Sequence, residues 1–155
     1  MNQRINFQEK GQKALKAMYA LGGYLAKSQV EKRLLNLIYL RVSQINGCAF
    51  CIDMHSKDLR FEGETEQRLY LLNAWREAPF YSERERAALA YAEAVTSLQN
   101  REVTDEVFNA VDAAFSDEEI VDLTVAITTI NSYNRFNIAF RTEAGSYEPG
   151  QFAVH

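Results

Sequence analysis

The residues best suited to redox chemistry in this sequence lie close together. Cys48, Cys51 and His55 form a C-x-x-C-x-x-x-H pattern that contains both cysteines and one of the two histidines. If a helix begins at Cys48, its rotation of about 100° per residue brings the three side chains onto one face. Both sulfurs then lie at the positive end of the helix dipole, which favours a thiolate, and the imidazole can exchange its proton. The pattern therefore indicates a candidate thiol redox site.

Three interpretations of this pattern remain open. In the first, one thiolate attacks a peroxide or a disulfide, and the second cysteine converts the resulting sulfenic acid into a disulfide before overoxidation. In the second, the two cysteines and His55 bind zinc, but a closed site needs a fourth ligand, and only His155 remains among cysteines and histidines. In the third, the cysteines are small buried hydrophobes. We favour the redox interpretation, and we expect no metal and no cofactor.

Composition limits the other classes of function. The chain has 155 residues, 47% hydrophobic and 25% charged, which is typical of one soluble globular domain. A net charge of -4 without a basic run argues against nucleic-acid binding. No apolar run approaches the roughly 18 residues that span a membrane, and the N-terminus does not resemble a signal peptide. We therefore expect a cytoplasmic protein, where a lone C-x-x-C pair is more often catalytic or metal-binding than structural.

Helical patterns dominate the chain. Its two prolines, Pro79 and Pro149, leave long stretches without a helix breaker. Apolar spacing and capping residues predict helices over residues 7–27, 30–45, 48–59, 65–77, 82–98, a short segment after Thr104, and about 117–141. Asn46-Gly47 is the expected stop of the second helix, and the runs Ser82–Glu85 and Ser116–Glu119 are capping boxes that open the fifth and the last helix. The fold class is therefore all-α, a single-domain bundle of about six to seven helices with an irregular tail over residues 143–155. A helix before the cysteines argues against a thioredoxin-like fold, which has a strand there.

Two sets of side chains are further candidates for the site or the core. Asn36, Tyr39 and Ser43 share one face of the helix predicted over residues 30–45, whereas Asp53 faces away from the cysteines. Three polar side chains lie on the last long helix: Asn131, Asn134 and Arg135. If they are buried they need hydrogen-bond partners, which can be one another, a neighbouring subunit or groups in the pocket. Trp75 is expected in the core or a pocket wall. The core face predicted for the first helix consists of Ala14, Leu15, Met18, Tyr19 and Leu21.

The segment Leu40–His55 resembles the core motif of a known family. Ser43, the run Ile45-Asn46-Gly47-Cys48 and the spacing Cys51-x-x-x-His55 are similar to the carboxymuconolactone decarboxylase superfamily, most closely its alkylhydroperoxidase D-like (AhpD-like), peroxidase-related branch. Gly63–Tyr70 and Ala74–Glu77 resemble the same branch, and Ile130–Arg135 does so more weakly. The resemblance covers roughly residues 30–98.

This resemblance implies an all-helical AhpD-like bundle, assembly into a homo-oligomer (trimer or hexamer), and reduction of a hydroperoxide through a cysteine pair. By the same comparison, Cys51 is the attacking cysteine, Cys48 the resolving cysteine, and His55 part of a proton relay. The electrons come from a dithiol donor, which can be a lipoylated protein.

One position departs from the family pattern. The family motif has a glutamate twelve residues before the first cysteine, and this chain has Asn36 there. An amide can hydrogen-bond His55 or a water but cannot accept a proton at neutral pH. Tyr39 and Ser43 are local replacement candidates, and Glu77 is a more distant one. Two other functions stay open: a lactone decarboxylase, which needs no thiol pair, and a non-enzymatic redox-sensing oligomer.

Overall fold

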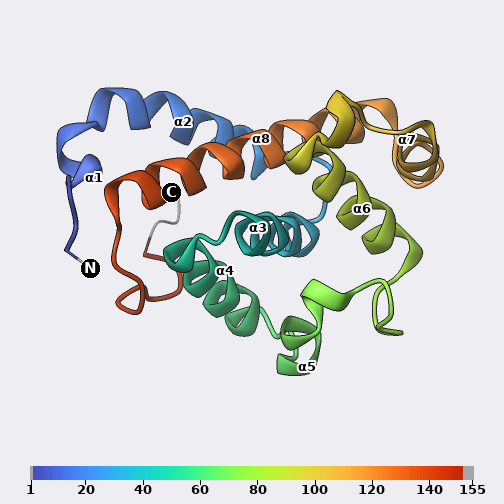
Figure 1. The fold of residues 1–155 in the computed structure, drawn as a ribbon, viewed down its shortest axis with the longest axis horizontal. Helices are drawn as coiled ribbons and strands as arrows, with labels where there is room; N and C mark the ends of the chain where they lie inside the picture. Colours follow the sequence, from blue (N-terminus) through green and yellow to red (C-terminus); the bar gives the residue numbers. More distant parts are fainter. Residues whose placement is uncertain (1, 152–155) are drawn as a thin grey trace.

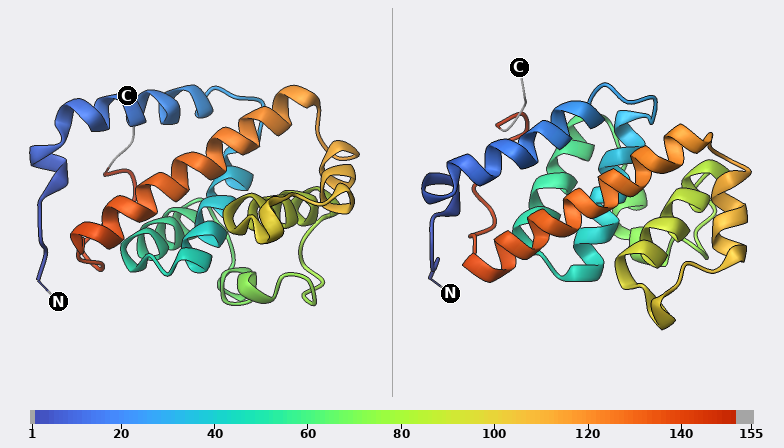
Figure 2. Two further views of the ribbon diagram at one scale, coloured as in Figure 1. Left: turned by 45° about the horizontal axis from the view of Figure 1, so that its top comes forward. Right: turned by 90° about the horizontal axis from the view of Figure 1, so that it is seen from above.

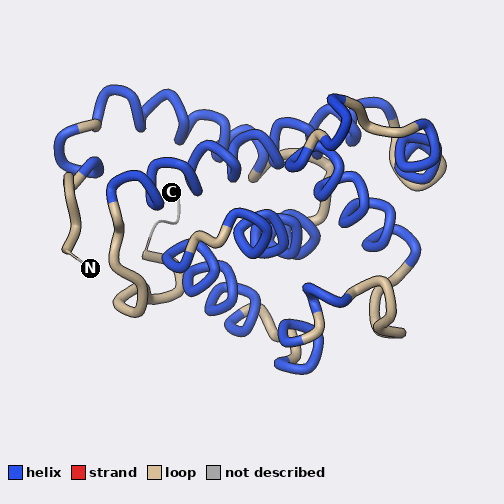
Figure 3. The backbone as a smooth tube through the Cα atoms, viewed as in Figure 1, coloured by secondary structure: helices blue, strands red, loops and turns tan. Residues whose placement is uncertain are grey.

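Capping and helix-terminating residues divide the chain into its elements, which the computed structural model describes for residues 2–151. The α-helices are α1 (Phe7–Lys10), α2 (Gln12–Leu25), α3 (Lys32–Asn46), α4 (Ala49–Phe61), α5 (Glu66–Tyr70), α6 (Glu83–Ser97), α7 (Asp105–Asp112) and α8 (Asp117–Phe140). Two 3₁₀ turns, η1 (Leu72–Ala74) and η2 (Gln99–Arg101), complete the set. Six of the eight α-helices have at least eight residues, and no strand occurs between residues 2 and 151 (Figure 3). The expected all-α fold is confirmed.

The ends of the two helices that frame the core are capped as predicted. Ser82 accepts a hydrogen bond from the backbone N–H of Glu85, whose carboxylate accepts one from the backbone N–H of Ser82. Ser116 and Glu119 form the same reciprocal pair at the start of α8. Each pair satisfies two backbone donors that the first helical turn leaves without partners.

Helix α3 lies at the centre of the fold. Figure 1 looks almost along α3, with α8 on one side of it and α4 on the other. Apolar side chains of α3, α6 and α8 form the largest buried cluster, which includes Ile38, Leu123 and Ile127. Helix α2 packs against α8 on the outer side of the bundle (Figure 2). No helix among residues 2–151 is both long and apolar enough to cross a membrane.

A glycine turn joins α3 to α4 and fixes where the cysteines begin. Gly47 has a left-handed backbone conformation, with φ at 69°. This conformation lets the N–H groups of Gly47 and Cys48 donate back to the carbonyls of Gln44 and Ser43, which ends α3. Cys48 therefore becomes the N-cap residue of α4, as the Asn46-Gly47 stop signal predicted.

Two predicted helices differ from the structure. The helix predicted over residues 7–27 is divided at Gly11 into α1 and α2, and its predicted core face is largely wrong. Leu15 is buried, but Tyr19 and Leu21 are 45% and 43% exposed, because the longer helix packs as an outer layer against α8. The helix predicted over residues 65–77 ends at Tyr70 and continues as η1. A 3₁₀ turn aligns residues three apart, which suits the buried pair Leu72 and Trp75.

Candidate redox site

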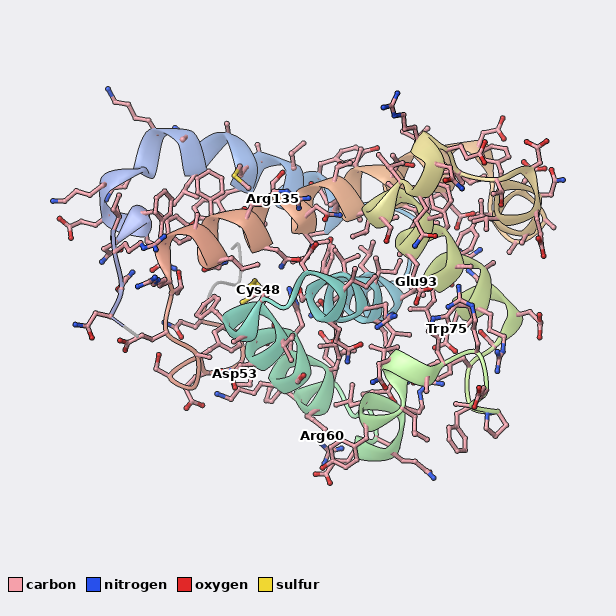
Figure 4. The ribbon with its side chains drawn as sticks, in the orientation of Figure 1. Cys48, Asp53, Arg60, Trp75, Glu93 and Arg135 are labelled. Atoms are coloured by element: carbon pink, nitrogen blue, oxygen red, sulfur yellow. A yellow bond between two sulfur atoms is a disulfide. The ribbon has the colours of Figure 1, made fainter. Side chains whose placement is uncertain are left out.

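The two cysteines are joined by a disulfide at the start of α4. Their Cα atoms are 5.4 Å apart, and both side chains are buried. Cys48 is the N-cap and Cys51 lies in the first helical turn, so both sulfurs lie at the positive end of the helix dipole. Figure 4 shows the Cys48 sulfur at this end of α4, on the side that faces α8.

His55 lies one helical turn after Cys51 and is almost completely buried. Neither ring nitrogen has a hydrogen-bond partner among the described residues. The ring packs against that of Tyr39, with the two ring centres 5.3 Å apart. Burial lowers the pKa of His55 to about 3, because the charged imidazolium loses its hydration. The imidazole is therefore neutral at physiological pH in this disulfide-bonded state.

A cavity of about 210 Å³ connects these groups. Its lining residues are Phe7, Gln8, Tyr19, Gly22, Tyr39, Phe50, Cys51, Met54, His55, Thr129, Ile130, Tyr133 and Asn137. Cys51 is in this lining and Cys48 is not, so only one of the two sulfurs belongs to a residue of the cavity wall. The lining residues include no aspartate, glutamate, lysine or arginine. An apolar cavity without charged lining residues favours a neutral organic molecule over an ion.

The structure adds residues of α8 that the sequence analysis did not name. Thr129, Tyr133 and Asn137 follow one another at four-residue intervals, so they form one stripe of the helix beside the cavity. Nδ2 of Asn137 lies 3.5 Å from Sγ of Cys51 and donates toward it. The available sequence signal was a further asparagine on the last predicted helix, after Asn131 and Asn134. It was not sufficient, because the position of the cavity relative to α8 depends on the tertiary fold.

The three residues expected to assist the proton relay, Asn36, Tyr39 and Ser43, do not all line the cavity. Asn36 is buried and its Nδ2 donates to Oε2 of Glu62 at 3.0 Å, so its amide hydrogen-bonds the carboxylate of the residue that caps the C-terminus of α4 and does not bond His55. Ser43 is fully buried, and its hydroxyl accepts a hydrogen bond from Nδ2 of Asn134. Tyr39 lines the cavity beside His55. Of the three, only Tyr39 is brought to the cavity.

The polar residues predicted on the last helix mainly connect α8 to α3. Nδ2 of Asn46 donates to both Asn131 and Asn134, at 2.9 Å in each case. Arg135 donates to the carbonyl and the side chain of Asn131. Asn131, Asn134 and Arg135 thus each have a hydrogen-bond partner, and none of the three lines the cavity.

The remaining candidates lie away from the cavity. Trp75 is buried in the core and donates its indole N–H to Glu93 at 2.8 Å. Asp53 accepts hydrogen bonds from Lys57 and from the backbone of Gly145 on the outer side of α4. Glu77 is exposed and does not line the cavity. Within residues 2–151, no three Cys, His, Asp or Glu side chains converge as a metal-binding group, and His155 lies outside the described residues.

The chain is similar in sequence to a known family. Residues 12–94 match the model of the carboxymuconolactone decarboxylase family. The uncharacterized protein YdfG of Bacillus subtilis (strain 168) is 44% identical over 146 residues, which cover 94% of this chain and 99% of that protein.

Solved structures show the same fold. A crystal structure from Agrobacterium tumefaciens, of a protein of unknown function with a suggested role as the antioxidant defence protein AhpD, has a TM-score of 0.89 and 45% identity, covering 94% of this chain and 100% of that chain. An uncharacterized peroxidase-related protein from Silicibacter sp. TM1040 has a TM-score of 0.77 and 27% identity, covering 90% and 74% of the two chains. All three similar proteins are uncharacterized or of unknown function.

Proposed function

The chain belongs to the carboxymuconolactone decarboxylase family, and from that premise we propose that it is a thiol-dependent hydroperoxide or disulfide reductase. The observation that carries the proposal is the Cys48–Cys51 disulfide beside an apolar cavity, with Cys51 in the cavity wall. A buried neutral imidazole one turn away adds a group that can exchange a proton.

In the proposed cycle, a dithiol donor first reduces the Cys48–Cys51 disulfide and is itself oxidised to a disulfide. The Cys51 thiolate then attacks the terminal oxygen of a hydroperoxide, ROOH. The O–O bond breaks, the sulfur becomes a sulfenic acid, and the other oxygen leaves as an alkoxide that takes a proton to become the alcohol ROH. The Cys48 thiol attacks the sulfenic acid, releases water and restores the disulfide.

His55 is proposed to manage the proton in this cycle. A thiolate on Cys51, one turn away on the same helix, favours the imidazolium by charge attraction and so raises the low pKa that burial imposes. The imidazole can then take the thiol proton and return it to the alkoxide. Asn36 occupies the position of the family glutamate, but its amide bonds Glu62 and not His55, so no carboxylate among the described residues bonds the imidazole.

The partners follow from the same proposal. We infer a cytoplasmic enzyme whose electrons come from a small dithiol or a lipoylated protein, and which assembles as a trimer or hexamer. Sedimentation equilibrium of the purified protein measures the subunit number directly.

The function is tested by steady-state consumption of cumene hydroperoxide, with dithiothreitol and dihydrolipoamide as alternative donors. Wild type should turn over, and Cys51→Ser should abolish consumption. Cys48→Ser is the matched control: after reduction and removal of the donor, it should consume about one equivalent and then stop with a sulfenic acid at Cys51, because no second thiol remains. Undiminished consumption by Cys51→Ser would exclude the proposal.

The rival functions give different results in the same experiment. A redox sensor would form its disulfide once and would not be recycled by either donor. A lactone decarboxylase would keep its activity on a carboxylated lactone when both cysteines are replaced by serine. The cavity lining argues against this second rival, because none of its residues is a cation that could bind a carboxylate.

A further inference from the structure

The side-chain amide of Asn137 is held in one orientation by its own helix. One N–H of the amide donates to the backbone carbonyl of Tyr133 at 2.9 Å, one turn earlier on α8. A carbonyl oxygen can only accept, so the end of the amide that faces it must be the NH₂ group. The second N–H of the same nitrogen is thereby directed to Sγ of Cys51, 3.5 Å away.

The contact between Asn137 and Cys51 is buried. Asn137 is 6% exposed, and its Oδ1 has no hydrogen-bond partner among the described residues. Leaving a buried amide oxygen without a partner is costly. The unpartnered atom belongs to a residue of the cavity wall, which His55 also lines, and a bound molecule with an O–H group could supply the missing donor there.

The charge environment of Cys51 makes a single N–H donor important. The titratable groups in the cavity lining are His55 from α4, Tyr39 from α3, Tyr133 from α8 and Tyr19 from α2. None of them is cationic in this disulfide-bonded state, since burial holds His55 neutral and a tyrosine carries no positive charge; burial raises the pKa of Tyr39 and Tyr133, which keeps both phenols neutral. In the reduced protein, the fixed donors to a Cys51 thiolate among the described groups are therefore the N-terminus of α4 and the N–H of Asn137, to which His55 adds a charge only when it has taken the thiol proton.

We propose that Asn137 is a catalytic residue of the redox site, whose N–H donates to the Cys51 thiolate in the reduced protein and so selects Cys51 as the attacking sulfur. This inference rests on the proposed function for its catalytic consequence, but its electrostatic part concerns the reduced protein alone. Cys48, at the N-cap and outside the cavity lining, has no such donor among the described residues. The two sulfurs of the pair are therefore made chemically unequal by one side chain of α8.

The test is the thiolate titration of reduced Cys48→Ser protein, which leaves Cys51 as the single thiol. Thiolate ultraviolet absorbance against pH should give a Cys51 pKa that rises by about one to two units in Asn137→Leu, because a hydrogen bond to a charged group is lost. Asn137→Asp should raise the pKa at least as much, since it replaces the donor with an anion. Asn109→Asp, on an exposed position of α7, is the matched control and should leave the pKa unchanged.

An unchanged Cys51 pKa in both Asn137 variants, with circular dichroism showing retained helix, would overturn the inference. Asn137→Gln controls for a purely structural effect, because it keeps the amide. Its Cys51 pKa should lie between that of the wild type and the higher value of Asn137→Leu. This result is independent of peroxide turnover. A wild type with no peroxidase activity but an Asn137-dependent thiol pKa would refute the proposed function and leave the electrostatic role of Asn137 standing.

Discussion

His55 is an imidazole whose charge state depends on its burial. Its two nitrogens have no partner among the described residues, and its ring is enclosed between Tyr39 and the cavity. Burial favours the neutral form, which lowers the pKa to about 3 from an ordinary value of 6.5. In the unfolded chain the imidazole is hydrated and keeps its ordinary pKa. The stability of the oxidised protein therefore depends on pH through this residue.

The expected pH dependence has a definite sign. Between pH 6.5 and about 3 the unfolded chain binds a proton at His55 that the native protein does not, so the free energy of unfolding falls as the pH is lowered. The largest slope from this one group is about 1.4 kcal/mol per pH unit. His55→Phe keeps an aromatic ring beside Tyr39 and removes the titration, so its unfolding free energy should fall less steeply across this window. Urea denaturation of the two oxidised proteins measures the difference, and parallel curves would contradict the neutral buried imidazole.

At the scale of the helices, local sequence predicted most of the framework. Capping boxes at Ser82 and Ser116 and the stop at Gly47 depend on residues a few positions apart, and the structure has all three. The division of the first helix at Gly11 was missed, and so was the outward face of α2, because the partner of α2 is α8, roughly a hundred residues away along the chain.

The candidate site divides in the same way. Cys48, Cys51 and His55 come from one helix, so their shared face follows from spacing alone. The contact of Asn36 on α3 with Glu62 at the C-cap of α4, and that of Asn137 on α8 with Cys51 on α4, each join separate elements. A pattern within one helix contains no information about which side chain of another helix will face it, so neither contact could be predicted from the sequence.

The link between Asn36 on α3 and Glu62 at the C-cap of α4 can be tested by exchanging the two groups. Asn36→Glu alone would place two carboxylates at a contact that is now 3.0 Å long, and should destabilise the protein by about 1–3 kcal/mol. Adding Glu62→Gln should recover most of this loss, because the amide at position 62 can then donate to the carboxylate at position 36. The ion pair of Glu62 with exposed Lys32 is lost in that variant but contributes little. Guanidinium denaturation of the wild type, both single variants and the double variant gives the coupling energy, and additive effects would show that the two side chains do not interact.

At the scale of the whole molecule, the cavity exists because three parts of the chain meet. Helices α3 and α4 provide Tyr39, Cys51 and His55, α8 provides the stripe that contains Asn137, and the N-terminal helices cover the remaining side. This cover is held partly by aromatic contacts, since the ring of Phe7 lies 5.5 Å from that of Phe136 and 5.7 Å from that of Phe140. Access to Cys51 therefore depends on how firmly α1 and α2 pack on α8.

Phe7→Ala should loosen this cover and make Cys51 more accessible to large molecules. In reduced Cys48→Ser protein, we expect a bulky maleimide to label Cys51 severalfold faster when Phe7 is truncated, while a small alkylating reagent shows a smaller change, since removing a buried aromatic ring leaves a gap at the cavity wall. Ile5→Ala is the matched control, because Ile5 lies in the same terminal segment but is 45% exposed and outside the cavity lining. Mass spectrometry measures the labelling rate of Cys51 with each reagent. If Phe7→Ala and Ile5→Ala label at the wild-type rate with both reagents, the N-terminal helices do not control entry, and molecules reach Cys51 by another side of the cavity.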